Sequence, residues 1–505
     1  MGGKKSVRFV LTGFLVLGLV GPLFAKESLE SKLSFSGSYR ARGYFLNHYW
    51  AGGEEAAGQD INLAYFEHRL RLNPELRIGE KAWVRAQVDF PDDQVFGDPG
   101  LTVFSETNDS SALDIKVKRA YGEAALPFLG GRIAAGRMGF DWGRGILFNS
   151  GDRKTDWGGP HSGDNYDQVQ IDIRPRGEGS DIHLVGAVSK LAEGDLEYWY
   201  DGKNDDIDRY LLAAQYRTDF LKGGLLLAGV HQSAITPSLI PVGSDGTRPS
   251  TGTDSITTDL HGKIDLIILR MELELIYRYG ETKGVPLLND RTFSITYPQR
   301  YQHQFGWIYE VGMKIDPLED FALEFGGANG DSAPDDPDLT AFFFDPNYQV
   351  SLLLFQEVLR RHLDRQYDSE SAALDWGNFG LDETQAENVK AIWAARYKTR
   401  GGVTNAFYVK PTFKVKPISD LTIAFSYLWA RARVGIDRFG DGKGRYGLGS
   451  EFDLGAEYRL SENASLGIQT GYLIPGDYFD TPGPGDEVSK AIGAFAVQSR
   501  LTINF

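Results

Sequence analysis

The sequence predicts an all-β fold, a transmembrane antiparallel up-and-down β-barrel, and three observations support this prediction. From Ser34 onward, segments of about ten residues alternate polar and apolar side chains and are separated by clusters of Gly, Pro, Asn and Asp. The composition of 60 Gly, 30 Phe, 24 Tyr and 9 Trp suits many strands joined by tight turns. After the first 25 residues, no stretch is apolar enough for a transmembrane helix.

Residues 1–25 have the three parts of a secretory signal peptide. Basic residues come first, an apolar run follows from Phe9 to Val20, and the helix-breaking pair Gly21-Pro22 precedes a cleavage site after Ala25. The apolar run is shorter than the roughly 20 residues that a membrane-spanning helix needs. We therefore expect residues 26–505 to be exported and to form a single barrel domain in the outer membrane of a bacterial cell.

Charge and composition exclude several classes of function. The formal net charge of −16 is the opposite of the basic surface that nucleic-acid binding requires. The sequence contains no Cys, so it has no disulfide framework, no thiol nucleophile and no attachment site for c-type haem. We find no motif for a metal ion or an organic cofactor and therefore expect neither.

The first predicted strands place charged residues on one face and apolar residues on the other. From Phe35 to Phe45, Arg40 and Arg42 alternate with aromatic and small side chains. The next two segments, 65–74 and 81–90, repeat this pattern on either side of a short turn. Their polar faces carry Glu67, Arg69, Arg71, Arg85 and Asp89.

The connections between these segments alternate in length. The short turn at 78–80 is followed by a long polar connection from Pro91 to Asp114. This alternation is typical of outer-membrane barrels, which have short periplasmic turns and long extracellular loops. At about 27 residues for each strand with its connection, the chain has room for about 18 strands, and 16 strands also fit.

The segment from Ile115 to Asp152 is the most informative part of the interior of the chain. Arg119 and Glu123 share one face of a strand, the returning strand carries Arg137, and a glycine-rich stretch then holds Arg144. Glycine lets backbones approach closely and turn sharply, so we expect Arg137 and Arg144 to be directed into the lumen. The alternative is a surface arginine pair in a soluble sheet.

A later strand, Leu269 to Tyr279, carries ions of both signs on its polar face, including Arg270, Glu272 and Glu274. Ionised groups inside a barrel need partners or water, so neighbouring strands should supply compensating charges. We therefore predict a lumen of mixed charge that is rich in arginine. The side chains expected along it are Arg40, Arg42, Arg69, Arg71, Arg85, Arg119, Arg137, Arg144, Arg270, Glu67, Asp89 and Glu123.

The segment from Val350 to Arg396 breaks the rhythm of the strands. Leu352 to Phe355 is too uniformly apolar for a strand with one wet face, and Glu383 to Arg396 suits a helical turn or two. We predict a long loop or plug-like insertion near residues 350–400, folded into the pore or over its mouth.

The last segment, Phe495 to Phe505, alternates strictly and ends on an aromatic residue. Phe505, Ile503 and Leu501 lie on the apolar face, which Ser499 interrupts. This arrangement resembles the C-terminal signal that bacterial outer-membrane barrels present to their assembly machinery. The alternative is an ordinary amphipathic final strand.

The order of several short motifs resembles the alginate-export family of outer-membrane barrels. That resemblance implies an 18-stranded barrel with an arginine-rich lumen that passes an anionic polysaccharide. The mixed charge predicted for the lumen departs from the family pattern. The matching pieces are Arg119 to Glu123 with Gly136-Arg137, Asn329-Gly330-Asp331, Phe342 to Asn347, Gly402 to Asn405, Asp453 to Tyr458, Gly471-Tyr472 and Pro475 to Asp477.

The sequence therefore favours a channel, with no enzymatic activity. Guanidinium groups along the lumen would form a ladder for carboxylate or phosphate groups, because Arg binds carboxylate bidentately and keeps its charge. Glu67, Asp89 and Glu123 would hold some of these arginines in place. The expected solutes are anionic, such as acidic oligosaccharides or polysaccharides, including alginate.

Two other functions are compatible with the sequence. One is a scaffold that sheathes an electron-carrying partner such as a multihaem cytochrome. The other is an outer-membrane hydrolase, since His231 and Ser233 stand two residues apart on one strand, as in the outer-membrane phospholipases. The expected partners of the channel are outer-membrane lipid and lipopolysaccharide, the barrel-assembly machinery, an anionic saccharide or other small anionic solute, and a periplasmic protein.

Overall fold

The computed structural model describes most of the chain beyond residue 30. The proposed signal peptide, residues 1–25, lies outside the described residues. The described residues are 31–49, 62–91, 94–95, 115–153, 155–159, 163–177, 179–192, 207–235, 251–283, 287–289, 294–296, 298–315, 318–333, 336–364, 399, 401–437, 439–482 and 488–505.

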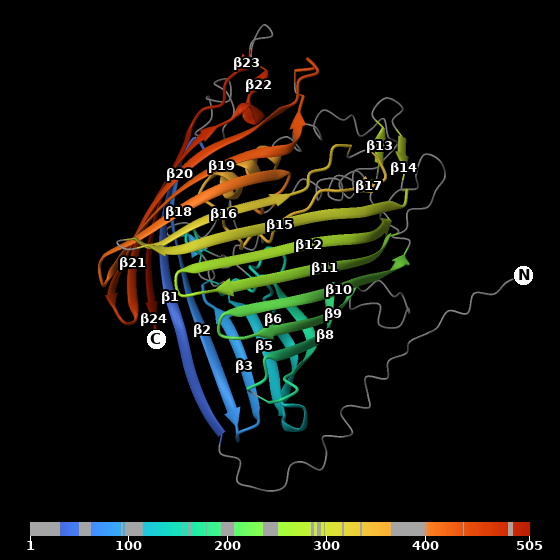
Figure 1. Ribbon diagram of the computed structural model, residues 1–505, viewed down its shortest axis with the longest axis vertical. Coiled ribbons are helices and arrows are strands. Elements are labelled where there is room, and N and C mark those ends of the chain that lie inside the picture. The colour runs from blue at the N-terminus through green and yellow to red at the C-terminus, as the bar shows by residue number, and fades with distance from the viewer. Residues whose placement is uncertain are drawn as a thin grey trace, which may run out of the picture.

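Eighteen antiparallel strands form a closed barrel, which confirms the predicted fold. Each strand pairs with its neighbours in sequence, and β1 closes the barrel by pairing with β24 from Ser38↔Asn504 to Asn47↔Phe495. Figure 1 shows blue β1 beside red β24. The barrel strands are β1 (Ser31–Asn47), β2 (Asn62–Ile78), β3 (Ala82–Asp89), β5 (Lys116–Leu126), β6 (Gly131–Gly139), β7 (Asn165–Ile173), β8 (Ile182–Ala192), β9 (Ile207–Arg217), β10 (Leu221–Ile235), β11 (Thr251–Asp265), β12 (Leu269–Lys283), β15 (Arg300–Ile315), β16 (Leu318–Ala328), β18 (Ala406–Ile418), β19 (Leu421–Ile436), β20 (Arg445–Ser461), β21 (Ala464–Pro475) and β24 (Ala494–Asn504).

The remaining elements are short. β4 (Gln94–Val95) and β17 (Asp338–Leu339) pair with β2 and β15, while β13 (Leu287–Asn289) pairs with β14 (Ser294–Thr296) and β22 (Thr481–Pro482) with β23 (Val488–Ser489). The helical turns are η3 (Pro127–Leu129), η5 (Leu354–Leu359) and η7 (Asp477–Phe479). Within the described ranges, no helix has both the length and the apolar character needed to cross a membrane.

Connections at the two ends of the barrel differ in length, as the sequence predicts. At one end, which we call the turn end, hairpins such as β2–β3 and β11–β12 are joined by only a few residues. At the other, the loop end, the connections are longer, and residues 329–405 between β16 and β18 are the longest of them. In outer-membrane barrels the turn end faces the periplasm and the loop end faces the outside of the cell.

The outer face of the barrel is apolar, which explains the alternation along the strands. Every second residue of a strand points outward, and large exposed hydrophobic side chains occur at these positions on nearly all barrel strands. Phe35 is 65% exposed and Leu212 is 66% exposed, for example. Such a continuous apolar surface suits contact with lipid.

The terminal residue Phe505 extends the closing ladder of the barrel. Its N–H donates to the carbonyl oxygen of Gly37 at 3.0 Å, and the N–H of Gly37 donates to the carbonyl oxygen of Phe505 at 2.8 Å. A Cβ atom at position 37 would lie 2.6 Å from the Phe505 ring. Glycine at this position therefore leaves the space that the terminal ring occupies.

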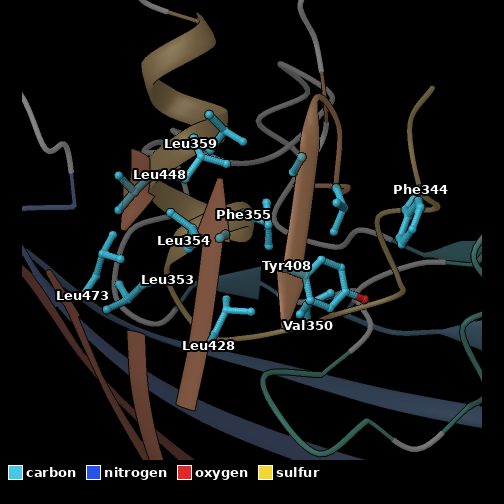
Figure 2. Packing of buried hydrophobic residues seen from close by; sticks show 14 of the residues in the cluster. Phe344, Val350, Leu353, Leu354, Phe355, Leu359, Tyr408, Leu428, Leu448 and Leu473 are labelled. Atoms are coloured by element: carbon cyan, nitrogen blue, oxygen red, sulfur yellow. The ribbon is translucent and has the colours of Figure 1, made fainter. Parts of the chain in front are cut away.

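The largest apolar core lies inside the barrel, where residues 350–364 pack against the inner faces of β18 to β21. Part of the predicted insertion near 350–400 is thus placed in the lumen, and residues 365–398 lie outside the described residues. Figure 2 shows how the two sides of this core meet. The loop contributes Val350, Leu353, Leu354, Phe355 and Leu359, and the wall contributes Tyr408, Leu428, Leu448 and Leu473.

Candidate functional site

One side of the lumen is lined with arginines, and we call this side the basic wall. It consists of the inner faces of β1, β2, β3, β5 and β24. Arg42 is 1% exposed and Arg69 is 7% exposed, so these cations are held deep in the interior. The basic wall comprises Arg40, Arg42, Arg69, Arg71, Arg85, Arg119 and Arg500.

Carboxylates on the same strands hold several of these arginines. Arg71 donates to both oxygens of Asp89, at 2.7 and 2.8 Å, and Asp89 is fully buried. Glu67 forms an ion pair with Arg42. Arg85 contacts Glu75 at 2.8 Å and Glu123 at 2.5 Å. The predicted acids Glu67, Asp89 and Glu123 therefore lie beside predicted arginines.

Arg137 does not face the lumen, so the predicted role of this residue is wrong. Glu123 opposes Ala134 and Tyr121 opposes Gly136, so even-numbered positions of β6 point inward. Arg137 therefore points outward, where it forms an ion pair with Asp167 at 2.6 Å, and about half of each side chain is exposed. The segment Gly131–Gly139 carries small residues on both faces, so its alternation does not reveal which face is buried.

Buried carboxylates line the inner faces of β11, β12, β15 and β16, opposite the basic wall, and of β20, and we call this set of residues the acidic wall. Glu274 and Asp259 are fully buried, and Glu324 is 3% exposed. Apart from Glu272 and Glu274, the sequence analysis missed this wall. The sequence pattern that could have revealed it is a single acidic residue within an otherwise apolar strand segment, as at Glu310 and Glu324. The acidic wall comprises Asp259, Glu272, Glu274, Glu310, Glu324, Glu451 and Asp453.

The described residues between β6 and β7, which are 140–153, 155–159 and 163–164 and which we call the first inward loop, reach the acidic wall through Arg144. Its guanidinium contacts Glu310 at 2.9 Å, Glu324 at 2.8 Å and Glu272 at 3.5 Å. It also donates to the hydroxyl oxygen of Tyr348 at 2.9 Å. The predicted lumen residue Arg144 therefore lies at the centre of the acidic wall.

The backbone conformation beside Arg144 supports this contact. The N–H of Arg144 donates to a carboxylate oxygen of Glu274. Gly143 has a φ of 50°, and a Cβ atom there would lie 2.5 Å from that carboxylate. A glycine at position 143 is needed for the loop to approach the wall this closely.

The same loop contacts the basic wall further along its length. Asp152 forms an ion pair with Arg119 at 2.5 Å, and the carbonyl oxygen of Gly159 accepts a hydrogen bond from Arg42 at 3.2 Å. Asp156 lies 2.7 Å from Lys414. Burial opposes ionisation of Asp156, but the charge of Lys414 outweighs it and holds the pKa of that carboxyl below its usual value. The first inward loop therefore crosses the lumen from one wall to the other.

An apolar contact fixes the start of this loop. Phe140, Trp142 and Phe148 pack against inward-facing side chains of β8, β9 and β10, including Leu211 and Leu226. Trp142 is 2% exposed. This part of the wall is largely apolar, and its buried cation, Arg209, lies 5.1 Å from the centre of the Phe148 ring.

Residues 336–364, which we call the second inward loop, are anchored by Glu451. Its carboxylate accepts three backbone hydrogen bonds, from the N–H groups of Leu352 at 3.0 Å and of Leu353 and Leu354 at 2.7 Å. Lys410 donates to the carbonyl oxygen of Val350 at 3.1 Å. Two polar wall residues thus satisfy the backbone of an otherwise apolar segment.

A polar cavity of about 480 Å³ lies between the two inward loops and the wall formed by β11 to β18. Cations and carboxylates alternate on its lining. Arg270, one of the predicted lumen residues, contacts Glu310 at 2.9 Å and Asp320 at 3.4 Å. Lys410 lies 3.6 Å from Glu324. A charged solute in this cavity therefore meets groups of both signs.

The two inward loops meet at a pair of carboxyl groups, Asp164 and Asp345. The N–H of Asp345 donates to the carbonyl oxygen of Ile146 at 2.9 Å, which places the second loop directly against the first. Asp345 is 6% exposed. Burial, reinforced by the charge of Asp164, raises the pKa of Asp345 to about 8.

The contact between the loops should therefore weaken as the pH rises. A raised pKa means that the joined state holds a proton which the separated state releases above a pH of about 4, so the contact is strongest below that pH and is lost as the pH rises through about 8. We expect more frequent current fluctuations in planar bilayers at pH 9 than at pH 5. Asp345→Asn should remove this dependence, and an unchanged pH profile in that variant would contradict the assignment.

His231 lies on the outer face, near the loop end of β10. Its Nδ1 lies 2.6 Å from Asp254 Oδ1 on β11. The side chain of Ser233 lies outside the described residues, so the predicted hydrolase pair is not placed. Among the described residues, no group of three or more His, Cys, Asp or Glu side chains is arranged to hold a metal ion.

Comparisons with known proteins identify the fold. No family model and no curated protein matches the sequence. OccK9 (OpdG) of Pseudomonas aeruginosa is 10% identical with a TM-score of 0.50, and the match covers 94% of this chain and 99% of that chain. OccAB3 of Acinetobacter baumannii is 12% identical with a TM-score of 0.49, covering 94% and 100%. An anion-selective porin from Comamonas acidovorans is 11% identical with a TM-score of 0.39, again covering 94% and 100%.

The likeness is to porin-like outer-membrane barrels. At such low identity it shows the fold alone, and the location predicted from the sequence, the bacterial outer membrane, is that of proteins with this fold. The comparisons do not point to the alginate-export family in particular.

Proposed function

We propose that the protein is an outer-membrane channel through which small anionic solutes diffuse along the basic wall. The observation that carries this proposal is the excess of arginine on the inner faces of β1, β2, β3, β5 and β24, where the seven arginines of the basic wall outnumber the carboxylates Glu67, Glu75, Asp89 and Glu123 beside them. Guanidinium groups offer paired donors to carboxylate or phosphate oxygens. Several moderate sites along a path favour flux over tight binding.

The inward loops support a small solute over a long polymer. The first inward loop contacts both walls, through Arg144 on one side and Asp152 on the other. A polysaccharide such as alginate would have to pass beside this crossing segment. We therefore propose single acidic sugars or short uronate oligosaccharides, which carry the carboxylate that the arginines recognise, as the solute class.

The same loops count against the scaffold function. A barrel that sheathes a protein partner needs an empty lumen, whereas residues 350–364 fill part of this lumen with their own apolar core. The charged cavity of about 480 Å³ suits a small molecule better than a folded partner.

Arg119→Gln should reduce the preference of the channel for anions. Arg119 belongs to the basic wall and contacts Asp152 at 2.5 Å, so its loss leaves the wall less positive and the carboxylate without this partner. We expect the chloride-to-potassium permeability ratio, measured from reversal potentials under a salt gradient, to fall about two- to fivefold, as for the loss of roughly 0.4–1 kcal/mol of interaction. Blockade by uronate oligomers should weaken in parallel.

Arg137→Gln provides the matched control for this measurement. It removes the same charge from a neighbouring strand but from the outer face, where Arg137 is paired with Asp167. We expect the permeability ratio of this variant to equal that of the unmodified protein. Equal effects of the two substitutions would show that the basic wall does not line the anion path.

A further inference from the structure

The loop end of the outer surface divides into two regions of different charge. On β6 to β11, outward-facing charged residues lie in register and alternate in sign. Arg137 pairs with Asp167 at 2.6 Å, and Asp167 stands opposite Lys190. Lys190 pairs in turn with Asp208 at 2.8 Å. Each cation in this region therefore already has a carboxylate partner.

The second region lies beside β20 on the loop end of β19, where Arg431 and Arg433 point outward. Arg431 stands opposite Phe407 on β18, whereas its neighbour Ala432 belongs to the interior core, and Arg433 follows on the same outward face. Both arginines are exposed. Among the described residues, neither forms an ion pair. This region therefore presents two positive charges that the protein itself does not neutralise there.

The position of these arginines along β19 places them just beyond the apolar band. The outward face of β19 runs from Leu421 at the turn end to Trp429, which is 40% exposed. Eight steps of about 3.3 Å span roughly 26 Å of strand, or about 20 Å of membrane at a tilt of roughly 40°. Since the apolar band of such barrels is roughly 25 Å tall, Arg431 and Arg433 reach the layer of lipid headgroups.

An aromatic side chain supports this surface. The guanidinium carbon of Arg431 lies 4.9 Å from the centre of the Tyr446 ring. Tyr446 in turn packs against Gly435, where a Cβ atom would lie 2.8 Å from the ring. Stacking on the ring orients the guanidinium while leaving its N–H groups available. Tyr446 and Trp429 also suit the interface between apolar chains and headgroups.

From this arrangement we infer that Arg431 and Arg433 bind the phosphate of a phosphorylated lipid headgroup in the extracellular leaflet. Two neighbouring guanidinium groups match the paired oxygens of a phosphate group, and their charge is complementary to it. The region on β6 to β11 lacks this property because its cations are already paired. The lipid should therefore occupy one side of the barrel, beside β19 and β20.

The test is native mass spectrometry of the detergent-solubilised barrel titrated with lipid A that carries two phosphates. The unmodified protein should retain this lipid, and the Arg431→Gln/Arg433→Gln double variant should bind it at least about tenfold more weakly, since two charge-assisted contacts are lost. Arg137→Gln/Lys190→Gln removes the same two units of charge and should leave the affinity within about twofold. Heat-modifiable migration on gels confirms that each variant is folded.

Three results would overturn the inference. The first is failure of the unmodified barrel to retain lipid A. The second is an equal loss of affinity in both double variants, which would show that lipid binding depends on total charge and not on the position of the arginines. The third is displacement of the lipid by inorganic phosphate at matched concentration, which would show that the arginines bind a free anion and not a lipid headgroup. None of these measurements depends on conduction, so the outcome is separate from that of the proposed channel.

Discussion

Arg144→Ala should shift the ion selectivity of the channel toward cations and destabilise the barrel. The substitution leaves Glu272, Glu310 and Glu324 without the guanidinium that contacts all three, and each of these side chains is at most 12% exposed. Removing one partner from a buried ionic cluster costs about 3–5 kcal/mol, because the remaining charges stay buried. Cations from solution should then enter the acidic wall to compensate.

The measurable results are a change in reversal potential and a lower temperature of heat-modifiable unfolding. The first inward loop also loses its side-chain contacts with the acidic wall and keeps only the backbone bond to Glu274, so single-channel conductance should rise. Arg144→Lys is the graded control, because it retains the charge but cannot contact three carboxylates with a planar fork. Its effects should lie between those of alanine and the unmodified protein. An Arg144→Ala channel with unchanged selectivity and stability would show that the loop is held elsewhere.

The fold could be predicted because the lipid bilayer imposes a local rule. Each strand must show lipid an apolar side chain at every second position, so segments such as Leu269–Lys283 reveal both their structure and their faces. The predicted arginines Arg40, Arg69 and Arg119 lie on the inner face for this reason. The segment Gly131–Gly139 has small residues on both faces, so its alternation does not distinguish them. Arg137 was therefore predicted on the inner face, whereas it lies on the outer face.

The architecture of the lumen could not be predicted because it depends on contacts between distant residues. Arg144 reaches Glu272 and Glu324, which are 128 and 180 positions away in sequence. No periodic pattern encodes such a contact, since the loop that carries Arg144 belongs to no strand. Most of the acidic wall was missed for a related reason: its members are spread over β11, β12, β15, β16 and β20, and only the closed barrel places them around one lumen.

Polar side chains of the two walls explain why the inward loops can be stable inside the barrel. A segment that enters a lumen must satisfy its backbone groups away from bulk water. The first inward loop does so largely through charged side chains of opposite sign on the two walls. The second is mostly apolar, and three of its buried N–H groups depend on one carboxylate, that of Glu451. The second loop should therefore respond more sharply to a single substitution.

Glu451→Ala should release the second inward loop from the barrel wall. It removes the acceptor for the N–H groups of Leu352, Leu353 and Leu354, all of which are buried. An unsatisfied buried group costs about 1–3 kcal/mol, so the loss should be about 3 kcal/mol or more. Because residues 350–364 fill part of the lumen, their release should increase single-channel conductance and expose the segment to protease.

Two neighbouring substitutions separate the hydrogen bonds from general effects of charge. Glu451→Gln keeps the shape and one acceptor oxygen, so it should retain part of the contact and give an intermediate conductance. Asp453→Asn removes a buried carboxylate two residues away that accepts none of these three bonds, and it should leave the loop in place. If Asp453→Asn released the loop as fully as Glu451→Ala, the anchor would be the charge of the acidic wall and not the three backbone hydrogen bonds.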